Sequence, residues 1–177
     1  MTEQELERAI QEIWALFKET DRQIQETSEK VAETTRSVNA LTGKWGKCVE
    51  GLVAPGAVSM FKERGIEVRE TYTRAESHRN GREMEIDVLV VNEAYVVAIG
   101  VKSTLKVEDV DEHIEKLRSF REFFPHFKDR KVIGAVAGIA IEEESDRYAY
   151  RRGLFVIGQT GETVKILNDE KFKPKAW

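Results

Sequence analysis

The chain has little of what characterises secreted or membrane-bound proteins. Its 177 residues include one cysteine, Cys48, which excludes an internal disulfide framework and a thiolate zinc cluster. No run approaches the roughly 18 apolar residues that a membrane span needs. The acidic start lacks the basic flank and apolar centre of a signal peptide. We therefore expect a cytoplasmic protein that does not bind a membrane.

Common catalytic motifs are also missing. The sequence holds no Walker loop, dinucleotide fingerprint or nucleophile elbow, and its three histidines do not form a pair with metal-ligand spacing. The net charge of −4 weighs against a general nucleic-acid coat, although arginines do cluster locally. These clusters are candidates for phosphate contacts, with an ordinary solvated surface as the favoured alternative: Arg74, His78, Arg79 and Arg82, then Arg147, Arg151 and Arg152.

The first 45 residues follow a coiled-coil heptad. Apolar and threonine side chains recur there at alternating spacings of four and three, with charged residues and glutamines on the outer faces. We predict that residues 1–45 form an oligomerisation arm through which the protein binds itself. The alternative is a single amphipathic helix that folds back on the rest of the chain. The a positions are Ile10, Phe17, Ile24, Val31, Val38 and Trp45, and the d positions are Leu6, Ile13, Thr20, Thr27, Thr34 and Leu41.

The remaining residues, 46–177, predict one α/β domain. A second helix is expected from Trp45 to Arg64, with an interruption at Pro55 and a left-handed end at Gly65. Three strands should follow at 66–73, 84–91 and 95–101, with a polar loop at 77–82. A helix at 108–124, a buried strand at 132–141, a short helix at 143–152 and strands at 154–158 and 163–167 complete the expected order.

Two of these strands carry a recognisable pair of motifs. The second strand contains Glu85-Ile86-Asp87, and the third contains Gly100-Val101-Lys102. Because side chains alternate along a strand, positions 100 and 102 share one face. A metal-dependent nuclease site needs an acid on each strand and a lysine two residues after the second acid. Only the acid at position 100 is missing.

This order of elements, with Asp87 on the second strand and Gly100-Val101-Lys102 on the third, resembles the PD-(D/E)XK nuclease superfamily. The resemblance covers roughly residues 46–167 and implies a restriction-endonuclease-like mixed sheet flanked by helices, here preceded by a long coiled-coil helix. More narrowly, the chain looks like an uncharacterised prokaryotic family with this fold, common in cyanobacteria. The features that carry this resemblance are the heptad arm, the segment from Glu50 to Pro55, the strand Glu85-Ile86-Asp87-Val88-Leu89 and Val101-Lys102-Ser103.

The resemblance also implies roles for individual residues. Asp87, the acid expected at position 100 and the carbonyl of Val101 would hold magnesium, while Lys102 would orient or activate the attacking water. A glutamate on the first core helix often joins such a site, and Glu50 stands at the matching position. Glu85 is the candidate for a relocated acid, and Gly100→Glu would restore the usual set.

The sequence therefore leaves three functions open. The first is a nuclease-fold protein with a degenerate active site that binds nucleic acid or acts as a scaffold. The second is a magnesium-dependent DNA endonuclease or exonuclease with a relocated carboxylate, and the third is a coiled-coil protein-interaction module. The same residues also have simpler explanations: an exposed Asp87–Lys102 pair, solvated carboxylates at Glu50 and Glu85, and a close-packing position at Gly100.

Overall fold

The computed structural model describes residues 2–177, except the side chains of Glu3 and residues 39–50. The chain divides into two units, Met1–Gly43 and Lys44–Trp177. The side chains of Cys48 and Glu50, and the seam positions Leu41 and Trp45, lie outside the described set. Within residues 2–177, no helix combines the length and the apolar character that crossing a membrane requires.

Helix α1 spans Glu3–Glu63, where the sequence predicts two helices separated near Gly43. Pro55 lies inside α1, so no new helix begins there, although proline has no N–H to donate to the preceding turn. The predicted end at Gly65 is confirmed. Gly65 has a φ of 77°, and the N–H groups of Gly65 and Ile66 donate to the carbonyls of Lys62 and Phe61. These bonds form a Schellman motif, which a glycine in the left-handed region favours.

A mixed six-stranded sheet forms the centre of the second unit, as the sequence predicts for an α/β domain. Its strands lie side by side in chain order, with antiparallel pairing from β1 to β3, parallel pairing from β3 to β5 and an antiparallel β6. The strands are β1 (Glu70–Arg79), β2 (Arg82–Val91), β3 (Tyr95–Leu105), β4 (Lys131–Ile141), β5 (Phe155–Thr160) and β6 (Thr163–Ile166).

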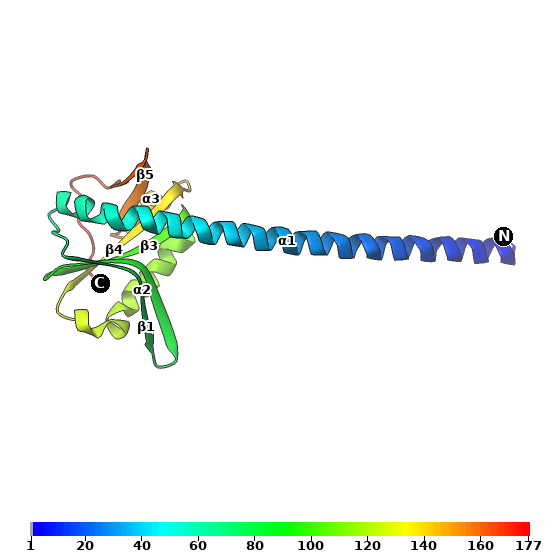
Figure 1. Cartoon of the computed structure of the whole chain (residues 1–177), viewed down its shortest axis with the longest axis horizontal. Coiled ribbons are helices and arrows are strands. Elements are labelled where there is room, and N and C mark those ends of the chain that lie inside the picture. The colour runs from blue at the N-terminus through cyan, green and yellow to red at the C-terminus, as the bar shows by residue number, and fades with distance from the viewer. Residues whose placement is uncertain (1) are drawn as a thin grey trace. The chain divides into compact units, whose positions relative to one another are not determined.

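Helices cover both faces of this sheet (Figure 1). Helix α2 (Val107–Phe123) joins β3 to β4 and packs on one face together with α3 (Ser145–Arg151), which joins β4 to β5. A short 3-10 helix, Pro125–Phe127, follows α2. The last turns of α1 pack on the other face through Val53, Ala57, Met60 and Phe61. Strand β4 is buried on both faces, which explains its continuous apolar run.

The first hairpin corrects the sequence prediction. The segment 77–82, expected to be a loop, instead contains the end of β1, a two-residue turn and the start of β2. Asn80 and Gly81 have φ values of 52° and 72°, as a tight type I′ turn requires. Strand β1 is an exposed edge strand and carries no clear alternation, so its polar residues resembled a loop. The hairpin end extends beyond the neighbouring strands (Figure 1).

Candidate functional site

Asp87 lies where β2 and β3 separate. The ladder between these strands pairs Val88–Val91 with Val96–Ile99 and stops there. One residue further, Asp87 Oδ2 accepts a hydrogen bond of 2.6 Å from the backbone N–H of Val101. The half-buried carboxylate therefore satisfies a strand N–H beyond the end of the ladder. On the β1 side of Asp87, Thr73 pairs with Val88 and Ala75 pairs with Ile86. Arg74 lies between these two pairs and has a φ of 52°.

The structure brings three of the predicted site residues together. Asp87, Val101 and Lys102 line a cavity of about 100 Å³ between the sheet and α2, with Gly100 in its wall. Residues from α2 close the cavity: Asp109, Glu112, His113 and Lys116.

Glu85 does not reach this cavity. It is exposed and pairs with Glu76 on β1, while Met84 and Ile86 on either side of it pack in the core on the α2 face. Side chains alternate from Met84 to Ile86, so Glu85 points away from α2. This alternation shifts by one residue at Asp87, so that Asp87 lines the cavity although it lies only two residues from Glu85. The relocated acid that the sequence suggests is therefore not placed with Asp87. The side chain of Glu50 lies outside the described residues.

The ring of His113 fills the space beside Gly100. A Cβ atom at position 100 would lie 2.8 Å from Nδ1 of His113 and 3.3 Å from its Cγ and Cε1. Real Cβ atoms are almost never found as close as 2.8 Å, so a side chain at position 100 would require this ring to move. The space that a side chain at position 100 would need is filled by a side chain from α2.

His113 is held in a single protonation state. Its Nε2 lies 3.0 Å from the carbonyl oxygen of Ala98, and because a carbonyl can only accept, Nε2 carries the proton. Burial lowers the pKa of His113 to about 4, although the hydrogen bond to Ala98 acts in the opposite direction. The imidazole is therefore neutral near pH 7, with its Nδ1 lone pair facing Gly100.

Two carboxylates from α2 hold the ammonium of Lys102. Nζ lies 3.2 Å from Asp109 and 3.4 Å from Glu112, and Glu112 also pairs with Lys116 at 3.4 Å. Burial opposes the charge of Lys102, but the two acids outweigh it and raise the Lys102 pKa. The same pairing lowers the pKa of Glu112 against the effect of burial. A lysine in this setting stays protonated and is a poor base.

These α2 residues were absent from the predicted site, although the sequence contains a signal for them. Val110, Ile114 and Leu117 mark the buried face of α2, and His113 falls on that face because it lies three residues after Val110. Asp109 and Glu112 flank the same stripe. What the sequence does not show is which strand residues this face meets.

The described residues do not fit a magnesium ion. Among the residues whose side chains the structure describes, no group of three histidine, cysteine, aspartate or glutamate side chains is placed to hold a metal. One oxygen of Asp87 is bonded to Val101, Gly100 offers no ligand, and Lys102 brings a positive charge. Magnesium needs a near-octahedral set of oxygens, which these groups do not supply.

Arginines near the hairpin end are tied to the end of α2. Arg79 and Ser77 donate to the carbonyl of Phe123 at 3.1 and 2.7 Å. Arg82 pairs with Glu122 at 3.1 Å, and its guanidinium lies 5.1 Å from the centre of the Phe123 ring. These contacts fix the hairpin on α2 and engage Arg79 and Arg82, two of the candidates for phosphate binding.

No family model matches the chain, and no curated protein matches it. Among solved structures, the chain is similar to the crystal structure of a protein of unknown function, AF1548, with 20% identity and a TM-score of 0.41. The match covers 60% of this chain and 58% of that one, so the chain spans less than two thirds of that protein's length. A similarity of this size does not bear on function, which is argued below from the residues themselves.

Proposed function

We propose that this chain is a self-associating scaffold protein whose second unit has a restriction-endonuclease-like fold with a degenerate site. The observation that carries the proposal is the exposed apolar seam of α1. Every side chain from residue 4 to residue 38 is exposed, and the apolar seam residues expose 46% to 63% of their surface. Large exposed apolar surfaces mark interaction sites. The apolar seam residues are Leu6, Ile10, Ile13, Phe17, Ile24, Val31 and Val38.

A second copy of this chain is the partner that the seam fits. A heptad seam is buried by another helix with the same repeat, because knobs at the a and d positions need holes at the same spacing. The copy supplies that repeat without any further assumption. Thr20 in the seam and Thr35 beside it donate to the carbonyls of Leu16 and Val31 in their own helix, so these two hydroxyls need no partner in the other copy.

The first turns of the seam favour a parallel arrangement. Trp14 and Leu16 lie next to the seam, at e and g positions, and expose 64% and 67% of their surface. They widen the apolar stripe near the N-terminal end of α1. Antiparallel pairing would place this wide end against the narrower, threonine-containing part of the seam. Parallel pairing places the two wide ends together and buries more apolar surface.

The nuclease-like part of the proposal is supported by the order of elements and by the positions of Asp87 and Lys102 on neighbouring strands. The degenerate part is supported by His113, which packs where a second carboxylate would be needed, and by the two acids that hold Lys102. Because the described side chains around Asp87 do not form a metal-ligand set and two acids hold Lys102, we expect no magnesium-dependent cleavage of a phosphodiester.

Self-association is tested by light scattering on the full chain and two matched double variants. Ile24→Lys/Val31→Lys places two charges in the seam, whereas Gln25→Lys/Ala32→Lys places two charges one position outside it. We expect the wild type and the outer variant to show a multiple of the 20.3 kDa chain mass, and the seam variant to shift toward 20.3 kDa. A monomeric wild type, or equal masses for the two variants, would overturn the proposal.

The degenerate site is tested separately with plasmid DNA and magnesium or manganese. The wild type should leave the plasmid intact, as should Asp87→Ala. Cleavage by the wild type that Asp87→Ala abolishes would favour a magnesium-dependent nuclease instead. Titration with duplex DNA at two salt concentrations shows whether DNA is a partner, because an affinity that depends on phosphate contacts falls steeply as the salt concentration rises.

A further inference from the structure

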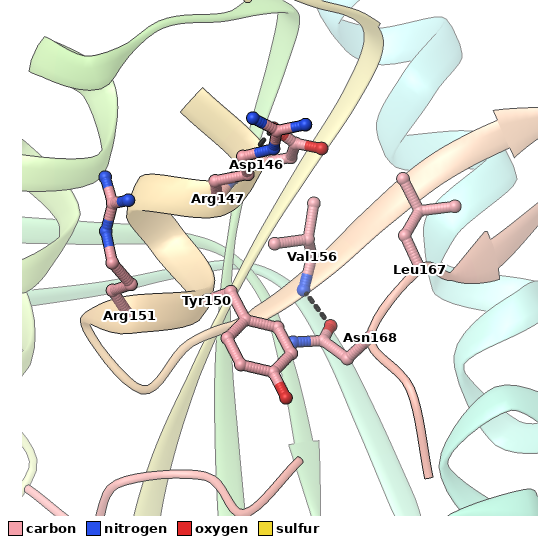
Figure 2. A pocket seen from close by; sticks show the side chains of 7 residues that line it. All are labelled: Asp146, Arg147, Tyr150, Arg151, Val156, Leu167 and Asn168. Carbon is pink, nitrogen blue, oxygen red and sulfur yellow. Dashed lines mark hydrogen bonds between the residues drawn. The ribbon is translucent and has the colours of Figure 1, made fainter. Parts of the chain in front are cut away.

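A second cavity lies away from Asp87, between α3 and the end of the sheet. Its volume is about 320 Å³, within the range of small-molecule sites. Figure 2 shows its lining, with Arg151 at the left, Asp146 and Arg147 at the upper centre and Leu167 at the right. The lining residues are Asp146, Arg147, Tyr150, Arg151, Val156, Leu167 and Asn168.

Positive charge is concentrated on one wall of this cavity. Arg147 and Arg151 are four residues apart on α3, so they lie on the same side of the helix. Both are exposed, and neither guanidinium has an ion pair or hydrogen bond with the residues that the structure describes. The Asp146 carboxylate, the one acid in the lining, accepts a bond of 2.7 Å from the backbone N–H of Arg147. Two guanidinium groups therefore remain available for an anion.

Apolar and aromatic groups form the rest of the lining. Val156 is buried, whereas Leu167 leaves 48% of its surface exposed. The exposed ring of Tyr150 is held in place, because it packs against Phe172 with 4.8 Å between ring centres and its hydroxyl donates to Asp169 at 3.2 Å. A fixed aromatic ring beside an exposed leucine suits a flat apolar group.

The wall opposite α3 is rigid. Asn168 Oδ1 accepts from the backbone N–H of Val156 at 2.7 Å, and its Nδ2 donates to the carbonyl of Leu154 at 3.2 Å. Arg64 donates to the carbonyls of Asn168 and Asp169. Both polar atoms of the Asn168 side chain are thus bonded to the backbone at residues 154 and 156, which fixes its position in the cavity wall. A wall fixed in advance reduces the entropy that binding would cost.

We propose that this cavity binds a nucleotide, with its phosphate on Arg147 and Arg151 and its base against Tyr150 and Leu167. Guanidinium groups match phosphate oxygens in charge and geometry, and bases stack on aromatic rings. The nucleotide would be either free or one unit of a single strand, since both present the same phosphate and base. This inference is independent of the seam and of the site around Asp87.

Calorimetric titration of the full chain with adenosine 5′-monophosphate, inorganic phosphate and a short oligothymidylate tests the proposal. Arg147→Gln and Arg151→Gln should each weaken nucleotide binding about tenfold or more, since each removes charged hydrogen bonds to phosphate. Tyr150→Ala should weaken binding of the monophosphate by roughly tenfold and binding of phosphate far less.

Arg152→Gln is the matched control. It removes the same charge just after the same helix, but Arg152 lies over the Tyr148 ring and does not line the cavity. Thermal melting of each variant shows that it is folded. Binding of the monophosphate, or of the oligothymidylate alone, supports the cavity and identifies the source of the nucleotide. The proposal is overturned if neither binds, if Arg152→Gln loses as much as the cavity variants, or if phosphate binds as tightly as the nucleotide.

Discussion

The contact between Gly100 and His113 can be measured as a coupling free energy. Gly100→Ala adds a single Cβ atom, which would lie 2.8 Å from Nδ1 and 3.3 Å from two ring carbons of His113. The ring cannot withdraw freely, because it is buried and its Nε2–H is bonded to Ala98. Overpacking of this kind costs about 1–3 kcal/mol, so we expect Gly100→Ala to lower the free energy of unfolding by that amount.

The same substitution should cost far less once the ring is gone. In a His113→Ala background, the added methyl faces an enlarged cavity, and we expect Gly100→Ala to change the stability by less than about 0.5 kcal/mol. The difference between the two backgrounds is the coupling. Urea denaturation at one fixed protein concentration measures it, since association of protomers would otherwise shift the midpoint.

Gly51→Ala is the control for a general effect of adding a methyl group. Gly51 lies in α1, and no atom lies within 4 Å of a Cβ placed there. Alanine should therefore stabilise the protein by up to about 1 kcal/mol through helix propensity. Equal costs of Gly100→Ala with and without the His113 ring would show that the ring does not fill position 100, and the argument for a degenerate site would lose its main support.

Three further predictions follow from individual contacts. The pKa of His113 is about 4 in the folded protein and near 6.5 in the unfolded one. The neutral imidazole therefore adds its full share to the free energy of unfolding above pH 6.5, and up to about 3 kcal/mol of this is lost as the pH falls toward 4. Urea midpoints of the wild type should fall more steeply over this range than those of His113→Leu. Gly81→Ala places a methyl group at a φ of 72° in the hairpin turn and should lower the thermal midpoint through a cost of about 1 kcal/mol, whereas Gly51→Ala should not lower it. In a Cys48→Ser background, Thr20→Cys at a d position should form an interchain disulfide under mild oxidation if the helices are parallel, and Lys18→Cys at an outer position should not; equal cross-linking on a denaturing gel would argue against parallel pairing.

The parts of the fold that could be predicted are those with strong local signals. The continuous apolar run of β4, the amphipathic stripe of α2 and the glycine that ends α1 each have one physical explanation, and each was expected. The β1–β2 hairpin was missed because the end of β1 is polar over Ser77–Arg79 and carries no apolar pattern there. The Asn80–Gly81 pair predicts a two-residue hairpin turn, whereas the polar residues around it predict a loop. In the structure the hairpin forms.

The sequence predicts which candidate-site residues share a face of one strand, but not which residues of α2 meet that face. Alternation along β3 shows that positions 100 and 102 share a face, and the structure places Asp87 beside them. Nothing in β3 shows that its face meets His113, Asp109 and Glu112, because that contact depends on how α2 packs over the sheet. A helix periodicity identifies the buried stripe of α2 but not its partner residues.

Gly100 therefore has a different meaning in the structure than in the sequence. In the sequence it is a site that lacks one acid, so that Gly100→Glu should complete it. In the structure, the buried ring of His113 packs against this glycine. A glutamate would have to displace that ring and break its bond to Ala98, and its carboxylate would join Asp109 and Glu112 in competing for Lys102. One substitution should consequently destabilise the domain without creating a metal site. An acid at this position would need a smaller residue at 113 as well, because Gly100 and His113 pack together from two elements.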